Sequence, residues 1–138
     1  DMLQAMNTGH EGSMATVHAN TPRDALTRVE NMLGMGGMQL TQKAMRQQIA
    51  SALTAVLQVA RLSDGKRKVT SLSEITGMEG DVITMQEIFV FRQTGIGPEG
   101  QVLGRFHATG VRPKFIERLL VRGVELPADM FNPGRVYE

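Results

Sequence analysis

Two histidines with polar neighbours are the side chains best suited to chemistry. His10 and His18 both lie within residues 9–24, and Thr16 and Asn20 flank the second histidine. An imidazole can exchange a proton, or donate a hydrogen bond to a charged group, near neutral pH. The elements around residues 9–24 are therefore expected to position these side chains.

The short uncharged run of residues 13–19 predicts a strand. It is too short for a buried helix and lies between a glycine-bracketed turn and a helix-start signal. It also lacks a clean apolar/polar alternation, as expected of a strand covered on both faces. We expect a central strand in a parallel sheet. Ligands bind beyond the carboxyl ends of such strands, so His18 and Asn20 would lie at a site.

Two helices follow. Thr21 can cap the first, Pro22 suits its first position, and Asp24 completes an acidic capping box. Its predicted buried stripe is Ala25, Leu26, Val29, Met32 and Leu33, and glycines 34, 36 and 37 end it. Thr41 caps the second helix. Residues 2–6 read as the last turns of an earlier helix that ends at residues 7–9.

The remaining chain predicts strands and one more helix. Residues 55–62 and 67–75 form a hairpin around Asp64-Gly65. Residues 82–85, 88–91 and 101–107 form a small meander, Pro113 opens a helix, and the tail from Pro127 is weakly structured. We place a domain boundary after residue 78, which gives domains 1–78 and 79–138.

Composition excludes several classes of protein. The 138 residues are 41% hydrophobic and carry 15 Lys/Arg against 14 Asp/Glu. The net charge of +1 provides no field for general nucleic-acid binding, so no nucleic-acid partner is expected. The sequence has no cysteine, which excludes disulfides and cysteine-ligated metal. No apolar run approaches the roughly 20 residues that span a bilayer.

The stretch around His18 resembles the histidine box of the secretion ATPase superfamily that drives type II secretion, type IV pili and type IV secretion. The wider chain is most similar to the CpaF/TadA-type ATPases of tight-adherence (Flp) pilus assembly. The motifs that carry this resemblance are Met6-Asn7-Thr8-Gly9-His10, Thr16-Val17-His18-Ala19-Asn20, Pro22-Arg23-Asp24-Ala25-Leu26, Gln48-Ile49-Ala50-Ser51-Ala52, Thr76-Gly77-Met78-Glu79-Gly80-Asp81 and Gly110-Val111-Arg112-Pro113-Lys114-Phe115.

The resemblance implies a fold that these residues only partly contain. No Gly-x-x-x-x-Gly-Lys-Ser/Thr motif occurs in the sequence. The family's acidic boxes and Walker B strand would lie upstream of Asp1, so the chain is expected to begin inside a helix. The implied fold is α/β: the C-terminal half of a RecA-like P-loop NTPase core, followed by a small β-meander and a C-terminal helical segment.

The resemblance also implies roles for individual residues. His18 would face the terminal phosphate of ATP, and His10 matches the first histidine of the box. Thr16, Asn20 and Arg46 are the candidates for cofactor contact. Packing remains the alternative for His18, a backbone-bonded turn for His10, and a surface role for Arg46. A zinc site from His10, His18 and His107 lacks a close ligand pair, and no Gly-x-Ser-x-Gly elbow supports a serine hydrolase.

The implied parent is a hexamer that hydrolyses ATP with Mg²⁺. It would work in the cytoplasm, peripheral to the inner membrane, on a pilus or secretion platform protein. The chain alone is expected to be inactive. The alternative is a module without catalytic function that supplies an oligomeric scaffold or a docking face for platform proteins.

Overall fold

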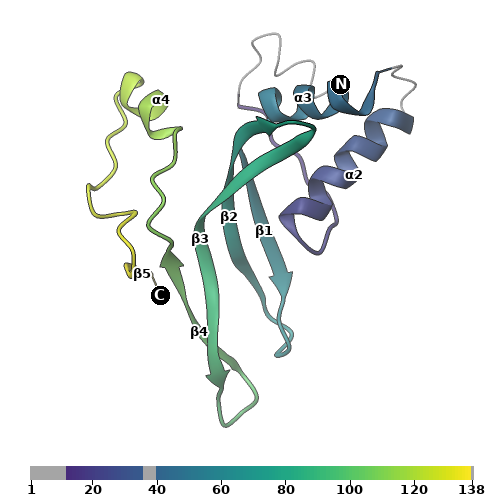
Figure 1. The fold of residues 1–138 in the computed structure, drawn as a ribbon. Coiled ribbons are helices and arrows are strands. Elements are labelled where there is room, and N and C mark those ends of the chain that lie inside the picture. Colours follow the sequence, from purple (N-terminus) through teal and green to yellow (C-terminus); the bar gives the residue numbers. More distant parts are fainter. Residues whose placement is uncertain (1–11, 36–39, 138) are drawn as a thin grey trace. The chain divides into compact units, whose positions relative to one another are not determined.

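The computed structural model describes residues 12–35 and 40–137 of the chain. These residues form helices, antiparallel strands and irregular connections. In chain order the elements are α2 (Pro22–Met35), α3 (Gln42–Ala52), β1 (Ala55–Arg61), β2 (Arg67–Glu79), β3 (Val82–Ile96), β4 (Val102–Ala108), α4 (Ile116–Val121) and β5 (Val136–Tyr137) (Figure 1). The predicted α/β class is confirmed. No helix in these ranges is long and apolar enough to cross a membrane.

The chain divides into two compact units. The first contains the chain up to Val56 together with Ile75–Met85, and the second contains Leu57–Glu74 and everything from Gln86 onward. The strands β1, β2 and β3 each contribute residues to both units. The domain boundary expected after residue 78 stays a prediction.

Local capping explains where α2 and α3 begin. The Thr21 hydroxyl accepts a hydrogen bond from the Asp24 N–H at 3.0 Å, and the Thr41 hydroxyl accepts one from the Ala44 N–H at 3.1 Å. Each bond satisfies one of the amides that a helix start leaves without a partner. Both predicted helix starts are confirmed. The earlier helix predicted to end at residues 7–9 lies outside the described residues.

The apolar faces of the two helices build the core of the first unit. Leu26 and Leu33 of α2 pack with Ile49 and Ala52 of α3 and with two strand residues, Ile75 and Ile83. Val29 lies at the edge of this cluster, whereas Met32 is 51% exposed. The predicted stripe on α2 was therefore one residue too wide.

The strands lie in the sheet order β1-β2-β3-β4-β5. Short turns join the first four strands, whereas residues 109–135, which include α4, connect β4 to β5. Gly65 ends the predicted Asp-Gly turn with a φ of 84°, and Gly80, with a φ of 60°, lies between β2 and β3. Strands joined in this way pair antiparallel. The β3–β4 ladder shifts register between Gln93 and Gly95. The hairpin and the meander are confirmed, although residues 82–96 form one strand where we predicted two shorter ones.

The parallel strand predicted at residues 13–19 is wrong. The structure forms no strand there, and the described sheet pairs consecutive strands. An uncharged run of this length is compatible with a strand but does not create one, because a strand depends on neighbouring strands for its backbone hydrogen bonds. The run instead leads into α2 as an irregular segment.

Aromatic side chains dominate the core of the second unit. The Phe89 ring contacts the rings of Phe106, Phe131 and Tyr137, with centroids 5.6 to 5.7 Å apart. Ile88 and Ala108 complete the buried cluster. Phe131 is only 3% exposed, and Tyr137 belongs to β5. The tail after Pro127 is thus packed, contrary to the prediction that it is weakly structured.

One acidic side chain links two turns of the second unit. Asp64 accepts a hydrogen bond from the Lys66 N–H at 3.0 Å and another from the Val102 N–H, at the start of β4, at 2.9 Å. The Val102 and Lys66 amides favour the charged carboxylate and hold the pKa of Asp64 below its usual value. Because the pKa falls on folding, this stabilisation is present above the unfolded pKa and is lost as the pH falls through the folded one.

We therefore expect Asp64→Asn to destabilise the chain at pH 7 and to do so less at acidic pH. The wild-type carboxylate is neutralised as the pH falls from the unfolded pKa through the lower folded pKa, so the stabilities of the two proteins should converge at acidic pH. Urea unfolding at a series of pH values measures this difference. A stability gap that stays constant across the range would show that the charge of Asp64 contributes nothing.

Candidate functional site

The predicted site residues lie on the segment that leads into α2. We call residues 13–20 the histidine segment. Thr16, His18 and Asn20 are exposed, whereas the intervening Val17 and Ala19 are half-buried. This alternation places all three predicted polar side chains on the side of the segment that is open to solvent. His18 is in neither of the two described core clusters.

A contact from Arg28 and the helix cap at Thr21 restrain the end of the histidine segment at α2. Arg28 Nη1 donates a hydrogen bond to the main-chain oxygen of His18. Three residues after His18, the Thr21 hydroxyl caps the helix. The short stretch between these anchors carries Asn20. The backbone at His18 and Asn20 is therefore fixed, while the side chains remain accessible.

Arg46 connects α3 to two other segments of the first unit. Its Nε lies 3.2 Å from each carboxylate oxygen of Glu30 on α2, and its Nη1 donates to the main-chain oxygen of Asp81 at 2.9 Å. The side chain of Glu30 is 11% exposed and that of Arg46 is 27% exposed. A carboxylate buried to this degree requires a charged or hydrogen-bonding partner. The contacts of Arg46 thus join α3 to α2 and to the turn before β3.

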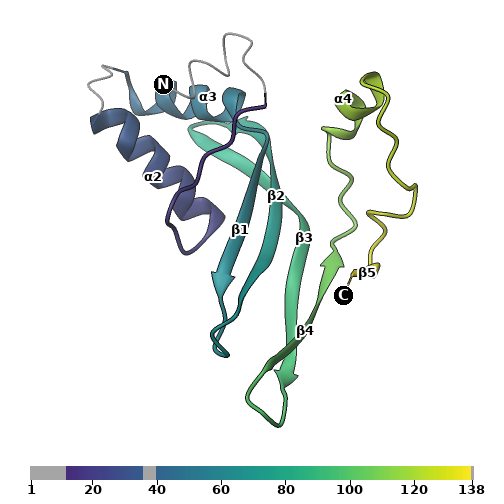
Figure 2. The same cartoon turned by 180° about the vertical axis from the view of Figure 1, so that it is seen from behind.

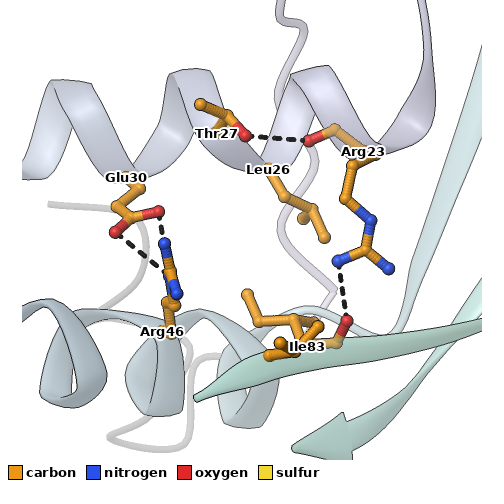
Figure 3. Close-up of a pocket in the computed structure, with 7 residues that line it drawn as sticks. Arg23, Leu26, Thr27, Glu30, Arg46 and Ile83 are labelled. Atoms are coloured by element: carbon orange, nitrogen blue, oxygen red, sulfur yellow. Dashed lines mark hydrogen bonds and ion pairs between the residues drawn. The ribbon is translucent and has the colours of Figure 1, made fainter.

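A small pocket opens beside this ion pair (Figure 3). Arg23 Nη1 donates to the Ile83 oxygen at 2.8 Å, and Leu26 lies between Arg23 and Glu30. The volume is about 220 Å³, below the roughly 300 to 1,000 Å³ of typical ligand pockets. Its lining residues are Arg23, Leu26, Thr27, Glu30, Arg46, Val82 and Ile83. We regard this pocket as part of the scaffold, because Glu30 and backbone oxygens engage both guanidinium groups.

The structure therefore separates the predicted residues into two groups. Thr16, His18 and Asn20 share one exposed segment, whereas Arg46 lines the pocket and is paired with Glu30. His10 lies outside the described residues, so its place beside His18 stays a prediction. Within residues 12–35 and 40–137, no three His, Cys, Asp or Glu side chains gather closely enough to hold a metal ion.

Sequence reasoning missed Arg28 and Glu30. Their partners lie 10 and 16 residues away in the sequence, and no helix or strand period links such positions. For Arg28, the only indication in the sequence was its helical spacing from Thr21. About two turns of helix separate it from Thr21, so both residues lie on one face of α2.

A comparison with known families identifies the chain. The sequence model of the family described as type II/IV secretion system protein matches residues 1–106. The chain belongs to this family. The match includes the histidine segment, α2, α3 and the strands as far as Phe106 in β4, and it leaves α4 and β5 outside.

Individual relatives of the chain are named for conjugal transfer. A putative conjugal transfer protein of Mycobacterium tuberculosis is 40% identical over 82 residues, which are 59% of this chain and 23% of that protein. The conjugal transfer protein TrbB of Rhizobium radiobacter is 33% identical over 79 residues, which are 57% of this chain and 22% of that protein. The chain thus spans less than a quarter of the length of these relatives.

Proposed function

We propose that this chain is part of a secretion ATPase, in which His18 contacts the terminal phosphate of bound ATP. The observation that carries the proposal is the family match over residues 1–106, which includes an exposed and anchored His18. Hydrolysis would drive the movement of a macromolecule across a membrane. Residues 1–78 would then be the C-terminal half of a RecA-like core, and residues 79–138 a small C-terminal β/α subdomain.

The histidine segment offers hydrogen-bond donors for the oxygens of a phosphate group. An imidazole, a hydroxyl and a side-chain amide can each donate a hydrogen bond to phosphate oxygen, and the segment offers all three in His18, Thr16 and Asn20. The described residues contain no cluster that would hold Mg²⁺. We assign to the histidine segment a contact with the phosphate oxygens of ATP.

Phosphoryl transfer depends on positioning and on stabilising charge at the phosphate oxygens. When bound, ATP and Mg²⁺ would supply the scissile phosphate and neutralise most of its charge, through a P-loop elsewhere in the parent protein. His18 would donate a hydrogen bond at the γ-phosphate and so respond to its loss after hydrolysis. Arg46, tied to Glu30, would transmit packing changes between α2 and α3.

The proposal also concerns the system in which the parent ATPase works. The motifs around His18, Gln48 and Gly77 favour an ATPase of Flp pilus assembly, whereas the relatives named above are conjugal transfer proteins. In either setting we propose identical subunits in a ring and a platform protein at the membrane. We propose a hexamer on the cytoplasmic side of the inner membrane.

A second candidate function is that of a docking or oligomerisation module. Leu57 and Val59 of β1 are 59% and 49% exposed, and they lie on the first strand of the sheet order. An exposed apolar strand is a surface onto which another chain can pack. This function would need no nucleotide.

Nucleotide binding in the presence of the P-loop segment of the parent separates the two functions, and ATP turnover by the purified chain tests the first one. We expect the 138 residues alone to show none, because they contain no P-loop. Adding a segment of the parent that contains the P-loop should restore nucleotide binding. Turnover by the chain alone that survives repurification would contradict the proposal. Binding of a platform protein without nucleotide, together with no response to the P-loop segment, would favour the docking module.

A further inference from the structure

We propose that Arg28 is a positioning residue for ATP hydrolysis, and that it acts by fixing the backbone of His18. The inference rests on the proposed function, since it requires His18 to act at the phosphate. It starts from a single contact, the hydrogen bond from Arg28 Nη1 to the main-chain oxygen of His18.

The path of the chain makes this contact possible. Residues before α2 turn back along the helix, as both views of the fold show (Figures 1 and 2). Arg28 lies about two turns after the cap residue Thr21, so its side chain extends from the same face of α2. The guanidinium thus reaches the oxygen of His18 from the helix that follows it.

The contact restrains the backbone from which the imidazole extends. Holding the main-chain oxygen restricts rotation of the peptide that follows His18, and the cap at Thr21 restricts the chain three residues later. His18 is exposed and packs in neither core cluster, so no surrounding side chains in those clusters orient it. A catalytic group that is misplaced by about 1 Å can lose about 100-fold in rate. Arg28 therefore restrains the backbone of His18, a residue in neither of the two described core clusters.

Arg28 should contribute little to overall stability. Its side chain is exposed, and a single hydrogen bond on the surface changes the folding free energy only slightly. The loss of Arg28 should therefore appear in turnover and not in the melting temperature. This separates a positioning role from a structural one.

Arg23 provides a matched control on the same helix. It is also exposed, and its Nη1 also donates to a main-chain oxygen, but that oxygen belongs to Ile83 in β3. Arg23→Met and Arg28→Met remove the same chemical group from α2. Only the second substitution releases His18.

The test uses the intact parent enzyme and measures kcat, nucleotide Kd and Tm for Arg28→Met, Arg28→Lys, Arg23→Met, His18→Ala and the Arg28→Met/His18→Ala double variant. We expect Arg28→Met to lower kcat about 10-fold with Kd within about 3-fold, and Arg28→Lys to restore part of the loss. Arg23→Met should match wild type. The double variant should be no slower than His18→Ala, because both changes remove one function.

Three results would overturn the inference, and they are distinguishable. If Arg28→Met keeps wild-type kcat while His18→Ala lowers it, Arg28 does not position His18 and the proposed function stands. If Arg28→Met weakens nucleotide binding about as much as turnover, Arg28 contacts the nucleotide directly. If His18→Ala itself keeps wild-type kcat, the proposed role of His18 fails, and the role of Arg28 fails with it.

Discussion

Replacing His18 by alanine in the intact parent enzyme should lower kcat on the order of 100-fold, the usual cost of losing one hydrogen-bond donor at a charged transition state. Nucleotide Kd should stay within a few-fold, because most of the binding energy belongs to the P-loop. The His18 side chain is exposed, so the free energy of unfolding should change by no more than about 0.5 kcal/mol. Steady-state turnover, nucleotide titration and thermal melting measure these three quantities.

Two other histidines serve as controls. His10→Ala should give a milder effect of the same kind, as expected for the first histidine of the box. His107 is paired with Val90 and Val136 in the strands of the second unit, and His107→Ala should leave turnover unchanged. An unchanged kcat for His18→Ala would remove this histidine from the mechanism. A loss of binding, turnover and melting temperature together would identify it as a structural residue.

The features predicted correctly depend on a few adjacent residues. Thr21 and Thr41 accept the hydrogen bonds that the capping pattern requires, and both lie next to the amides that they cap. The Asp64-Gly65 turn is equally local, since Asp64 bonds the Lys66 amide and Gly65 supplies the positive φ. Such interactions form within one turn of chain, so sequence spacing determines them.

The features predicted wrongly depend on distant partners. Residues 13–19 have the composition of a covered strand, but pairing decides strand formation, and the sheet pairs other segments. Phe131 lies in a polar, proline-containing tail, yet it packs against Phe89, which the sequence alone does not place nearby. Loop composition describes local preference and does not indicate which distant core a single aromatic side chain joins.

In the candidate site, too, the sequence predicted the residues that are close together in the chain and missed the contacts between distant ones. His18, Thr16 and Asn20 follow from the motif that resembles the histidine box, and the structure keeps them together on one exposed segment. Arg46 contacts Glu30 and the main-chain oxygen of Asp81, and its contact with phosphate stays a prediction. An arginine has the same residue type whether it binds a ligand or a buried carboxylate, so only geometry distinguishes the two roles.

Glu74 is a buried acidic residue that the sequence did not single out. It lies on β2 and is 3% exposed. Its two carboxylate oxygens accept hydrogen bonds from the Lys114 N–H at 2.8 Å and the Phe115 N–H at 2.9 Å. These amides immediately precede α4, where a helix leaves its first N–H groups without backbone partners. Glu74 therefore ties the start of α4 to a strand 40 residues earlier in the chain.

Glu74→Ala should destabilise the chain by about 1 to 3 kcal/mol, the cost of leaving buried donors without an acceptor. Glu74→Gln keeps one acceptor oxygen and should lose less. Glu87→Ala removes an exposed carboxylate from β3 and should change stability by no more than about 0.5 kcal/mol. Urea unfolding measures all three. Amide hydrogen exchange adds a local test, because Lys114 and Phe115 should lose protection in Glu74→Ala before the strands do. Wild-type stability together with protected amides at these two residues would show that other groups hold α4 in place.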